Sequence, residues 1–154
     1  MEPVKIKLEK KYVTGISAVT NNKNESDFEN AKIPGLWNDF MYKNLYDKIP
    51  GKTPESRVYA VYTNYISDHN DDYKIIVGAE VKDGSEPGEF GKVCLDDGDY
   101  YKFNVAGKFP EAIIKAWGDI WNYFEKNKDV KRAYSSDFEE YISEEELNIY
   151  ISVR

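Results

Sequence analysis

Two kinds of hydrophobic pattern alternate along the chain: short extended runs and longer runs with helical spacing. The runs 57–67 and 73–81 are rich in β-branched and aromatic residues, and the polar turn DHNDD between them completes a predicted hairpin. Before them, 4–20 is long enough for one or two strands, and NNKNESDFENAK is predicted to be a polar loop. Segment 33–51 predicts a helix, because its apolar residues recur at helical spacing, at Leu36, Trp37, Phe40, Met41 and Leu45.

The same order of elements returns in the second half of the chain. YYKFNVAG (100–107) is predicted to be a strand, a helix follows Pro110, and RAYSSDFEEYI and LNIYISV form a second predicted hairpin. The two halves also share short sequences, since WND at 37–39 corresponds to WGD at 117–119. The sequence therefore predicts an α+β fold, a duplicated β-α-β-β with pseudo-two-fold symmetry, in which both helices pack on one side of an antiparallel sheet.

The repeats define one domain, 1–154, because 154 residues leave little room for a second. Repeat 1 covers about 1–81 and repeat 2 about 100–154. Between them, 82–99 is rich in Gly, Pro and charge, and we expect it to be a linker.

The strand SSDFEEYI places one carboxylate, Glu139, in an aromatic row. Pairing the last hairpin around Ser143 to Glu146 predicts that Glu139 lies opposite Tyr150. The same register puts Tyr141 opposite Asn148 and Phe138 opposite Ile151. Two interpretations of Glu139, and of Glu80 at the end of 73–81, stay open: a solvated strand carboxylate, or an anion inside an aromatic pocket.

Charge and composition narrow the classes of partner. The 21 basic and 28 acidic residues give a net charge of −7, which repels phosphate backbones and disfavours nucleic acid as a direct partner. The N-terminus lacks the apolar core of a signal peptide, and no run is long enough to span a membrane. With Cys94 as its only cysteine, the chain is expected to be cytoplasmic.

The common catalytic and metal-binding patterns lack their parts in this sequence. His69 lies in a polar turn and Cys94 in the predicted linker, so no nucleophile stands in a recognisable frame. The acidic runs 68–72 and 96–99 are explained by turn-forming Asp and Asn rather than by calcium. We therefore expect no metal, no cofactor and no assigned catalytic residue.

Aromatic residues are the remaining candidates for a site. Trp117 and Trp121 are four residues apart and share one face of the second helix, and Trp37 holds the matching place on the first. A Trp stripe of this kind is more often part of an ordinary core, so both interpretations stay open.

The motifs WGDIWNYF, DFEEYI, LNIYISV and NYISDHNDDYKIIVGAEV, together with the two-copy pattern, resemble the effector-binding domains of the gyrase-inhibitor-like family. That family includes the drug-sensing parts of AraC-type and MerR-type regulators and stand-alone members carried on mobile gene cassettes. The resemblance covers nearly the whole chain. One departure is that the usual I-P-V ending reads Ile151-Ser152-Val153 here.

The resemblance implies a central ligand cavity lined by aromatic residues, with a buried Glu that meets cationic, lipophilic ligands. The Glu of the family's F-E-x-Y strand corresponds to Glu139, and the aromatic residue of its last strand to Tyr150. The further ligand-binding candidates are Tyr141, Trp117, Trp121, Trp37, Tyr59, Tyr101 and Glu80.

Three functions are compatible with this resemblance. The first is a stand-alone binder of cationic, amphipathic small molecules, linked to transcriptional regulation through a DNA-binding regulator or another protein in trans. The second is a hydrolase of strained electrophilic molecules, with Glu139 beside Tyr150 as general base. The third is a gyrase-type modulator that binds a basic protein partner through its acidic surface.

Overall fold

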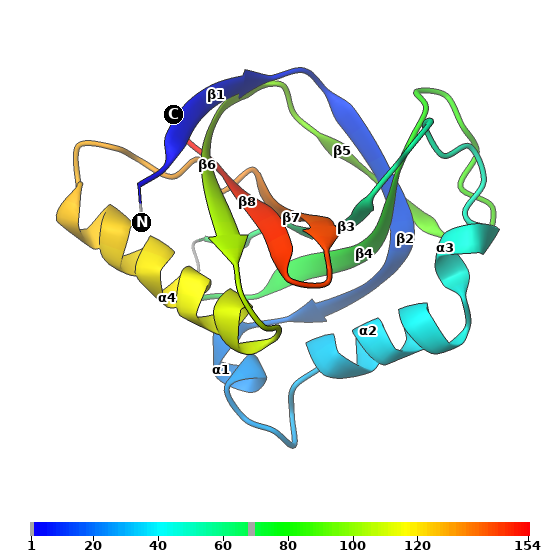
Figure 1. The fold of residues 1–154 in the computed structure, drawn as a ribbon, viewed down its shortest axis with the longest axis horizontal. Helices are drawn as coiled ribbons and strands as arrows, with labels where there is room; N and C mark the ends of the chain where they lie inside the picture. Colours follow the sequence, from blue (N-terminus) through cyan, green and yellow to red (C-terminus); the bar gives the residue numbers. More distant parts are fainter. Residues whose placement is uncertain (1, 68–69) are drawn as a thin grey trace.

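The structure is a computed structural model that describes residues 2–67 and 70–154. Within these residues one antiparallel sheet of eight strands has the order β1-β6-β8-β7-β3-β4-β2-β5 (Figure 1). The strands are β1 (Val4–Leu8), β2 (Lys11–Thr20), β3 (Val58–Thr63), β4 (Tyr73–Val81), β5 (Gly91–Leu95), β6 (Gly98–Ala106), β7 (Ser136–Ser143) and β8 (Glu146–Ser152). The helices are α1 (Asn22–Glu25), α2 (Ile33–Tyr42), α3 (Leu45–Lys48) and α4 (Glu111–Lys126).

The strand order confirms the predicted duplication. β2-α2-β3-β4 and β6-α4-β7-β8 follow the same path, and β3 meets β7 at the centre of the sheet so that the two halves mirror each other in strand order. Each edge strand pairs with the other half of the chain. β1, which precedes the first β-α-β-β unit, pairs with β6 of the second, and β5, which precedes the second unit, pairs with β2 of the first. β5 lies within 82–99, the predicted linker, where a short apolar run, Val93-Cys94-Leu95, supports a strand among Gly and charged residues.

The sheet is curled, and its two faces carry different cores. Figure 1 shows an incomplete ring of strands with α2 and α4 outside it on the same side. The helix face holds one cluster under α2, with Ala60 and Val77, and another under α4, with Phe103 and Ile149. The inner face closes on a third cluster that includes Tyr59, Tyr100, Phe138 and Tyr150.

A pair of glycines allows the closest approach in this curl. Gly15 on β2 and Gly78 on β4 lie opposite each other. A Cβ atom on Gly15 would lie 1.9 Å from the carbonyl oxygen of Val77, and one on Gly78 would lie 1.9 Å from that of Thr14. Any side chain at these positions would force the two strands apart.

Two predicted elements differ in detail from the structure. The helix expected over 33–51 is broken into α2 and α3, because Asn44 between them adopts a left-handed conformation with φ of 52°. The segment expected to be a polar loop contains α1, which is capped by the Asn21 side chain accepting a hydrogen bond from the Asn24 amide at 2.8 Å. Asp68 and His69, from the turn DHNDD, lie outside the described residues.

α4 is the helix that positions most of the site. It follows Pro110, as predicted, and runs for 16 residues. Ala116 and Ile120 are buried against the sheet, and Trp117 and Trp121 lie beside them. Among the helices of the described residues, none combines the length and the apolar character that a membrane span requires.

Candidate functional site

A bulge in the last hairpin decides which side chains meet. Ser143 pairs with Glu146 as predicted, but the next pair is Tyr141 with Leu147, so Ile142 is extra on β7. The predicted register is therefore wrong by one residue: Glu139 lies opposite Ile149, and Phe138 lies opposite Tyr150. Because a one-residue slip reverses the face, Tyr150 belongs to the inner face and Glu139 to the helix face.

The carboxylate of Glu139 is buried among aromatic hydrogen-bond donors. The residue is 1% exposed. The Trp117 indole Nε1 donates to Glu139 Oε2 at 2.7 Å, and the Tyr62 hydroxyl donates to the same oxygen at 3.0 Å. The Tyr141 hydroxyl donates to Oε1 at 2.6 Å. Three elements, α4, β3 and β7, thus converge on one carboxylate.

The neighbouring carboxylates of β7 are compensated differently. Asp137 accepts from Arg132 Nη2 at 2.7 Å, and Glu140 lies 3.7 Å from Arg57 Nη1. Among the residues that the structure describes, no Lys or Arg lies within ion-pair distance of Glu139. When Glu139 is ionised, its hydrogen bonds are satisfied, but no Lys or Arg of the described residues balances its charge.

Burial and hydrogen bonding act on this carboxylate in opposite directions. Burial raises the pKa of Glu139 above its ordinary value, and the hydrogen bonds from Tyr141, Trp117 and Tyr62 partly offset that rise. The pKa values of Tyr62 and Tyr141 are also raised, by burial first and then by the adjacent charge of Glu139. Both phenols stay protonated near neutral pH and remain donors.

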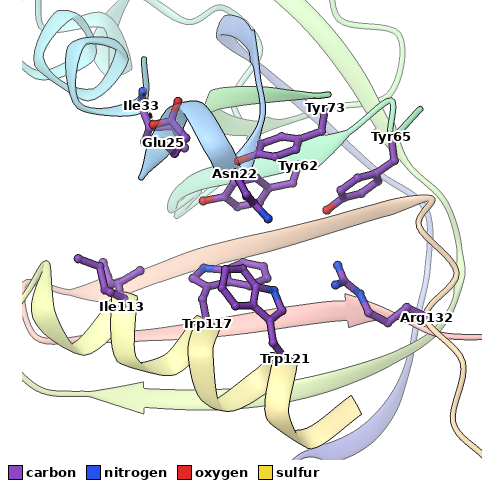
Figure 2. Close-up of a pocket in the computed structure, with 11 residues that line it drawn as sticks. Asn22, Glu25, Ile33, Tyr62, Tyr65, Tyr73, Ile113, Trp117, Trp121 and Arg132 are labelled. Carbon is purple, nitrogen blue, oxygen red and sulfur yellow. Dashed lines mark hydrogen bonds between the residues drawn. The ribbon is translucent and has the colours of Figure 1, made fainter. Parts of the chain in front are cut away.

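A pocket of about 270 Å³ lies between α4 and the strands and shares two residues with the hydrogen-bond donors of Glu139 (Figure 2). Trp117 and Tyr62 are at once donors to Glu139 and walls of the pocket, and their rings meet edge to face at 5.3 Å. We call it the aromatic pocket; its other lining residues are Tyr65, Tyr73, Trp121, Ile33, Ile113, Ile114, Asn22, Glu25 and Arg132.

Glu25 places a carboxylate in the wall of the aromatic pocket itself. It accepts hydrogen bonds from the backbone amides of Lys32 at 2.9 Å and Ile33 at 3.1 Å, and so caps the start of α2 from outside that helix. Thr20 Oγ1 donates to it at 2.5 Å. Figure 2 shows Glu25 and Arg132 on opposite sides of the pocket.

Comparison with known proteins shows the family of this chain. The model of the integron-associated effector-binding proteins, Cass2, matches residues 6–153. The chain belongs to this family. An integron cassette protein of Vibrio cholerae is 35% identical, with a TM-score of 0.85 over 99% of this chain and 96% of that one. A comparison with curated protein sequences gave no match.

More distant structures share the fold of the family. SAV2435, solved with tetraphenylphosphonium bound, is 14% identical, with a TM-score of 0.81 over 100% of this chain and 94% of that one. EcmrR, solved in a complex with DNA, is 13% identical, with a TM-score of 0.63 over 99% of this chain and 57% of that one. The fold of this family thus occurs in a protein bound to a cationic ligand and in one bound to DNA.

The structure separates the predicted site residues of this family member into groups. Trp117, Trp121 and Tyr141 lie on the helix face near Glu139, and Trp37 packs edge-on against Tyr141 at 5.1 Å. The inner face holds Tyr59, Tyr150 and Glu80. Tyr101 packs beside Tyr123 and Phe124 near the end of α4. The role of each residue in ligand binding stays a prediction.

The inner-face candidates form a polar network of their own. The Tyr59 and Tyr150 hydroxyls each donate to Glu140 at 3.1 Å. Glu80 accepts from Tyr59 at 3.5 Å and lies 3.9 Å from Lys11 Nζ. The hydrolase hypothesis required Glu139 beside Tyr150, and the structure places these two residues on opposite faces of the sheet.

Sequence reasoning missed Tyr62, Tyr65, Tyr73 and Arg132 as lining residues. Tyr62 shares a face with Glu139 only because β3 pairs with β7, with Ala60 opposite Glu139, and this pairing joins two different repeats. Tyr65 lines the same pocket as Tyr62 because Asn64, between β3 and Tyr65, has a φ of 53° and ends the alternation of faces along the strand. The available signal was the excess of tyrosine, 13 residues, which indicates a cavity without locating it.

Proposed function

We propose that this protein binds cationic, lipophilic small molecules in the aromatic pocket and acts as an effector-binding protein. One observation carries the proposal: the buried Glu139 carboxylate receives hydrogen bonds from neutral donors and has no Lys or Arg partner among the described residues. Asp137 and Glu140, on the same strand, both have cationic partners within the protein. A ligand cation would supply the partner that Glu139 lacks.

The interaction energies are large enough for Glu139 to attract a ligand cation through the wall of the pocket. Glu139 lies behind Tyr62 and Trp117, so a cation on their ring faces would be separated from the carboxylate by about one ring. Two unit charges about 6 Å apart attract by about 3 kcal/mol at an effective dielectric constant of about 20. Each aromatic face adds about 0.5–2 kcal/mol for a cation.

The same geometry favours broad specificity. Tyr62 and Trp117 already use their polar hydrogens on Glu139, and Tyr73 donates to Asn22 Oδ1 at 3.0 Å. These residues therefore offer a ligand ring faces rather than directional hydrogen bonds. Charge and shape, rather than hydrogen-bond pattern, would select the ligand.

The relatives agree with this function in chemistry and context. The family is described as integron-associated effector-binding proteins, and SAV2435 was solved with a lipophilic cation. The occurrence of the fold in EcmrR supports a link between ligand binding and regulation, which for this protein would act through a DNA-binding regulator or another protein in trans.

The test is a titration with tetraphenylphosphonium, followed by tryptophan fluorescence and by thermal unfolding. Because Trp117 and Trp121 line the pocket, binding should quench or shift their emission, with a dissociation constant in the micromolar range, about −8 kcal/mol. Bound ligand should also raise the melting temperature. Neutral triphenylphosphine oxide, of related shape, is the control and should bind far more weakly. Equal binding of both compounds, or of neither, would contradict the proposal.

A further inference from the structure

A second pocket, of about 380 Å³, lies beside the aromatic pocket and has a lining rich in basic residues. It is formed by the last turns of α4, the loop that follows α4, and Arg154. We call it the basic pocket. Four basic side chains line it against one acidic side chain, Glu125, in a protein whose net charge is −7; they are Lys128, Lys131, Arg132 and Arg154.

Arg132 is the buried member of this group. It is 8% exposed, and Nη2 donates to Asp137 at 2.7 Å. A guanidinium carries five N–H donors, and Nε of Arg132 is buried without a hydrogen-bond partner among the residues that the structure describes. Such a donor is costly to leave unpaired, and the guanidinium that carries it lines the basic pocket.

Neighbouring groups hold the Arg132 side chain in place and charged. The Tyr134 ring covers it, with the ring centroid 4.4 Å from Cζ. Burial alone would lower the pKa of Arg132, but Asp137, Tyr65 and Tyr134 raise it above its ordinary value. The backbone is fixed as well, because Arg132 forms an isolated antiparallel β-bridge with Val153, and the Ala133 amide donates to the Ser152 carbonyl at 2.9 Å.

The rest of the basic pocket combines apolar surface with accessible charge. Trp121 and Phe124 from α4 provide aromatic walls, while Lys131 is exposed. Three features oppose an anion here: Asp137, which pairs with Arg132, Glu125, whose carboxylate lies 4.0 Å from Lys128 Nζ, and the partial negative charge at the C-terminus of α4. Lys128 offsets Glu125, and solvent screens the helix terminus at this exposed end. Asp137 offsets much of the charge of Arg132, so the positive charge that remains for an anion comes mainly from Lys131 and Arg154.

We propose that the basic pocket binds an amphipathic organic anion, with its aromatic or aliphatic group against Trp121 and Phe124 and its carboxylate or sulfonate among Arg132, Lys131 and Lys128. This site is separate from the one for cations, and the proposal does not rest on the proposed function. Trp121 and Arg132 line both pockets, so a bound cation and a bound anion would lie close together. Each would tighten the binding of the other by the same factor.

Calorimetric titration of the whole protein with 2-naphthoate tests this proposal. The double variant Lys128→Gln, Lys131→Gln removes two charges whose side chains hold no core contact, and it should weaken naphthoate binding at least tenfold. Neutral 2-naphthalenemethanol should bind the parent and the variant alike. The matched control, Lys43→Gln with Lys48→Gln near α2 and α3, makes the same change in net charge and should leave naphthoate binding within twofold.

Three results would overturn the proposal: no naphthoate binding to the parent, equal binding to the Lys128/Lys131 variant, or an equal loss in the control. Saturating tetraphenylphosphonium distinguishes the two sites. Naphthoate should still bind in its presence, and displacement would place the anion in the aromatic pocket instead. Failure of tetraphenylphosphonium to bind would count against the proposed function and would leave the naphthoate result intact.

Discussion

Glu139 and Glu140 are adjacent in the sequence but occupy opposite faces of the sheet, and their surroundings differ in kind. Glu139 is enclosed and receives hydrogen bonds from one indole and two phenols. The Glu140 side chain is 15% exposed and lies near Arg57, and the Tyr59 and Tyr150 hydroxyls donate to it. Both carboxylates therefore receive tyrosine hydrogen bonds, but of the two only Glu140 has a Lys or Arg within ion-pair distance among the described residues.

The difference shows how a protein can bury a charge and still keep it available. Hydrogen bonds from neutral donors reduce the cost of burial, but they leave the net charge unchanged. A nearby Arg cancels much of the field that a ligand would experience. Neutral compensation at Glu139 is thus compatible with binding an external cation, and ionic compensation at Glu140 is typical of a structural role.

The largest expected effect comes from Glu139→Gln. This change keeps the side-chain volume and removes the charge, so the affinity for tetraphenylphosphonium should fall by about 2–5 kcal/mol, measured by calorimetry. Binding of a neutral compound of the same shape should change much less. Glu140→Gln is the matched control one residue away and should alter cation affinity by less than about 1 kcal/mol. Similar losses in both variants would show that the two faces do not differ as described.

Two tyrosine variants compare the faces through stability. Tyr62→Phe removes the donor 3.0 Å from Glu139, and Tyr150→Phe removes the donor 3.1 Å from Glu140. Loss of a hydrogen bond to a buried charge costs about 1.5–3 kcal/mol, so we expect that loss in the free energy of unfolding for Tyr62→Phe. Water and Arg57 can replace the donor at Glu140, so Tyr150→Phe should cost about 1 kcal/mol or less. Urea unfolding would measure both, and the reverse order would contradict the comparison.

The pH dependence of cation binding should report on Glu139. Because burial raises its pKa, the carboxylate becomes protonated at a higher pH than an ordinary glutamate as the solution is acidified. Affinity should be constant above that pKa and fall about tenfold, or 1.4 kcal/mol, per pH unit below it. The profile for Glu139→Gln should be flat over the same range. A flat profile for the parent protein would exclude Glu139 as the counter-charge.

The smallest expected effect is on the stability of the ligand-free protein. A carboxyl whose pKa is raised by folding favours the folded state most below its unfolded pKa, and this contribution is lost as the pH rises through the folded pKa. Glu139→Gln removes the cost of burying an ionised carboxylate, which stabilises the fold at neutral pH. The glutamine amide also accepts weaker hydrogen bonds from the tyrosines and the indole, which destabilises it. The two terms nearly cancel, so at neutral pH the variant should be as stable as the parent or up to about 1 kcal/mol more stable by urea unfolding. A destabilisation of several kcal/mol would show that the carboxylate is needed for folding.

The sequence predicted the fold well because its signals are local and occur twice. Helical spacing in α4, the turn between β3 and β4, and the repeated Trp motif needed no knowledge of distant contacts. The prediction of the site depended on strand register and on strand pairing, which involve residues far apart in the sequence. One extra residue, Ile142, reversed the face of Tyr150, and the pairing of β3 with β7 brought Tyr62 to Glu139. A bulge of this kind leaves no mark in the hydrophobic pattern, and pairing between repeats depends on the assembled sheet.

The exchange of β1 and β5 between the two halves bears on the origin of the fold. A half-length protein with this strand order would have no pairing partner for its first strand within its own chain. Two copies could pair that strand with each other's sheet and so form a closed, symmetric dimer. A single polypeptide that carries both halves keeps the exchange at any protein concentration and does not require the halves to be identical. The site is accordingly asymmetric, because Glu139, Trp117 and Tyr141 come from the second half and Tyr62 from the first. A symmetric dimer of halves would carry two such carboxylates, whereas the described residues of this chain form one, so the proposed cation site would occur once per molecule.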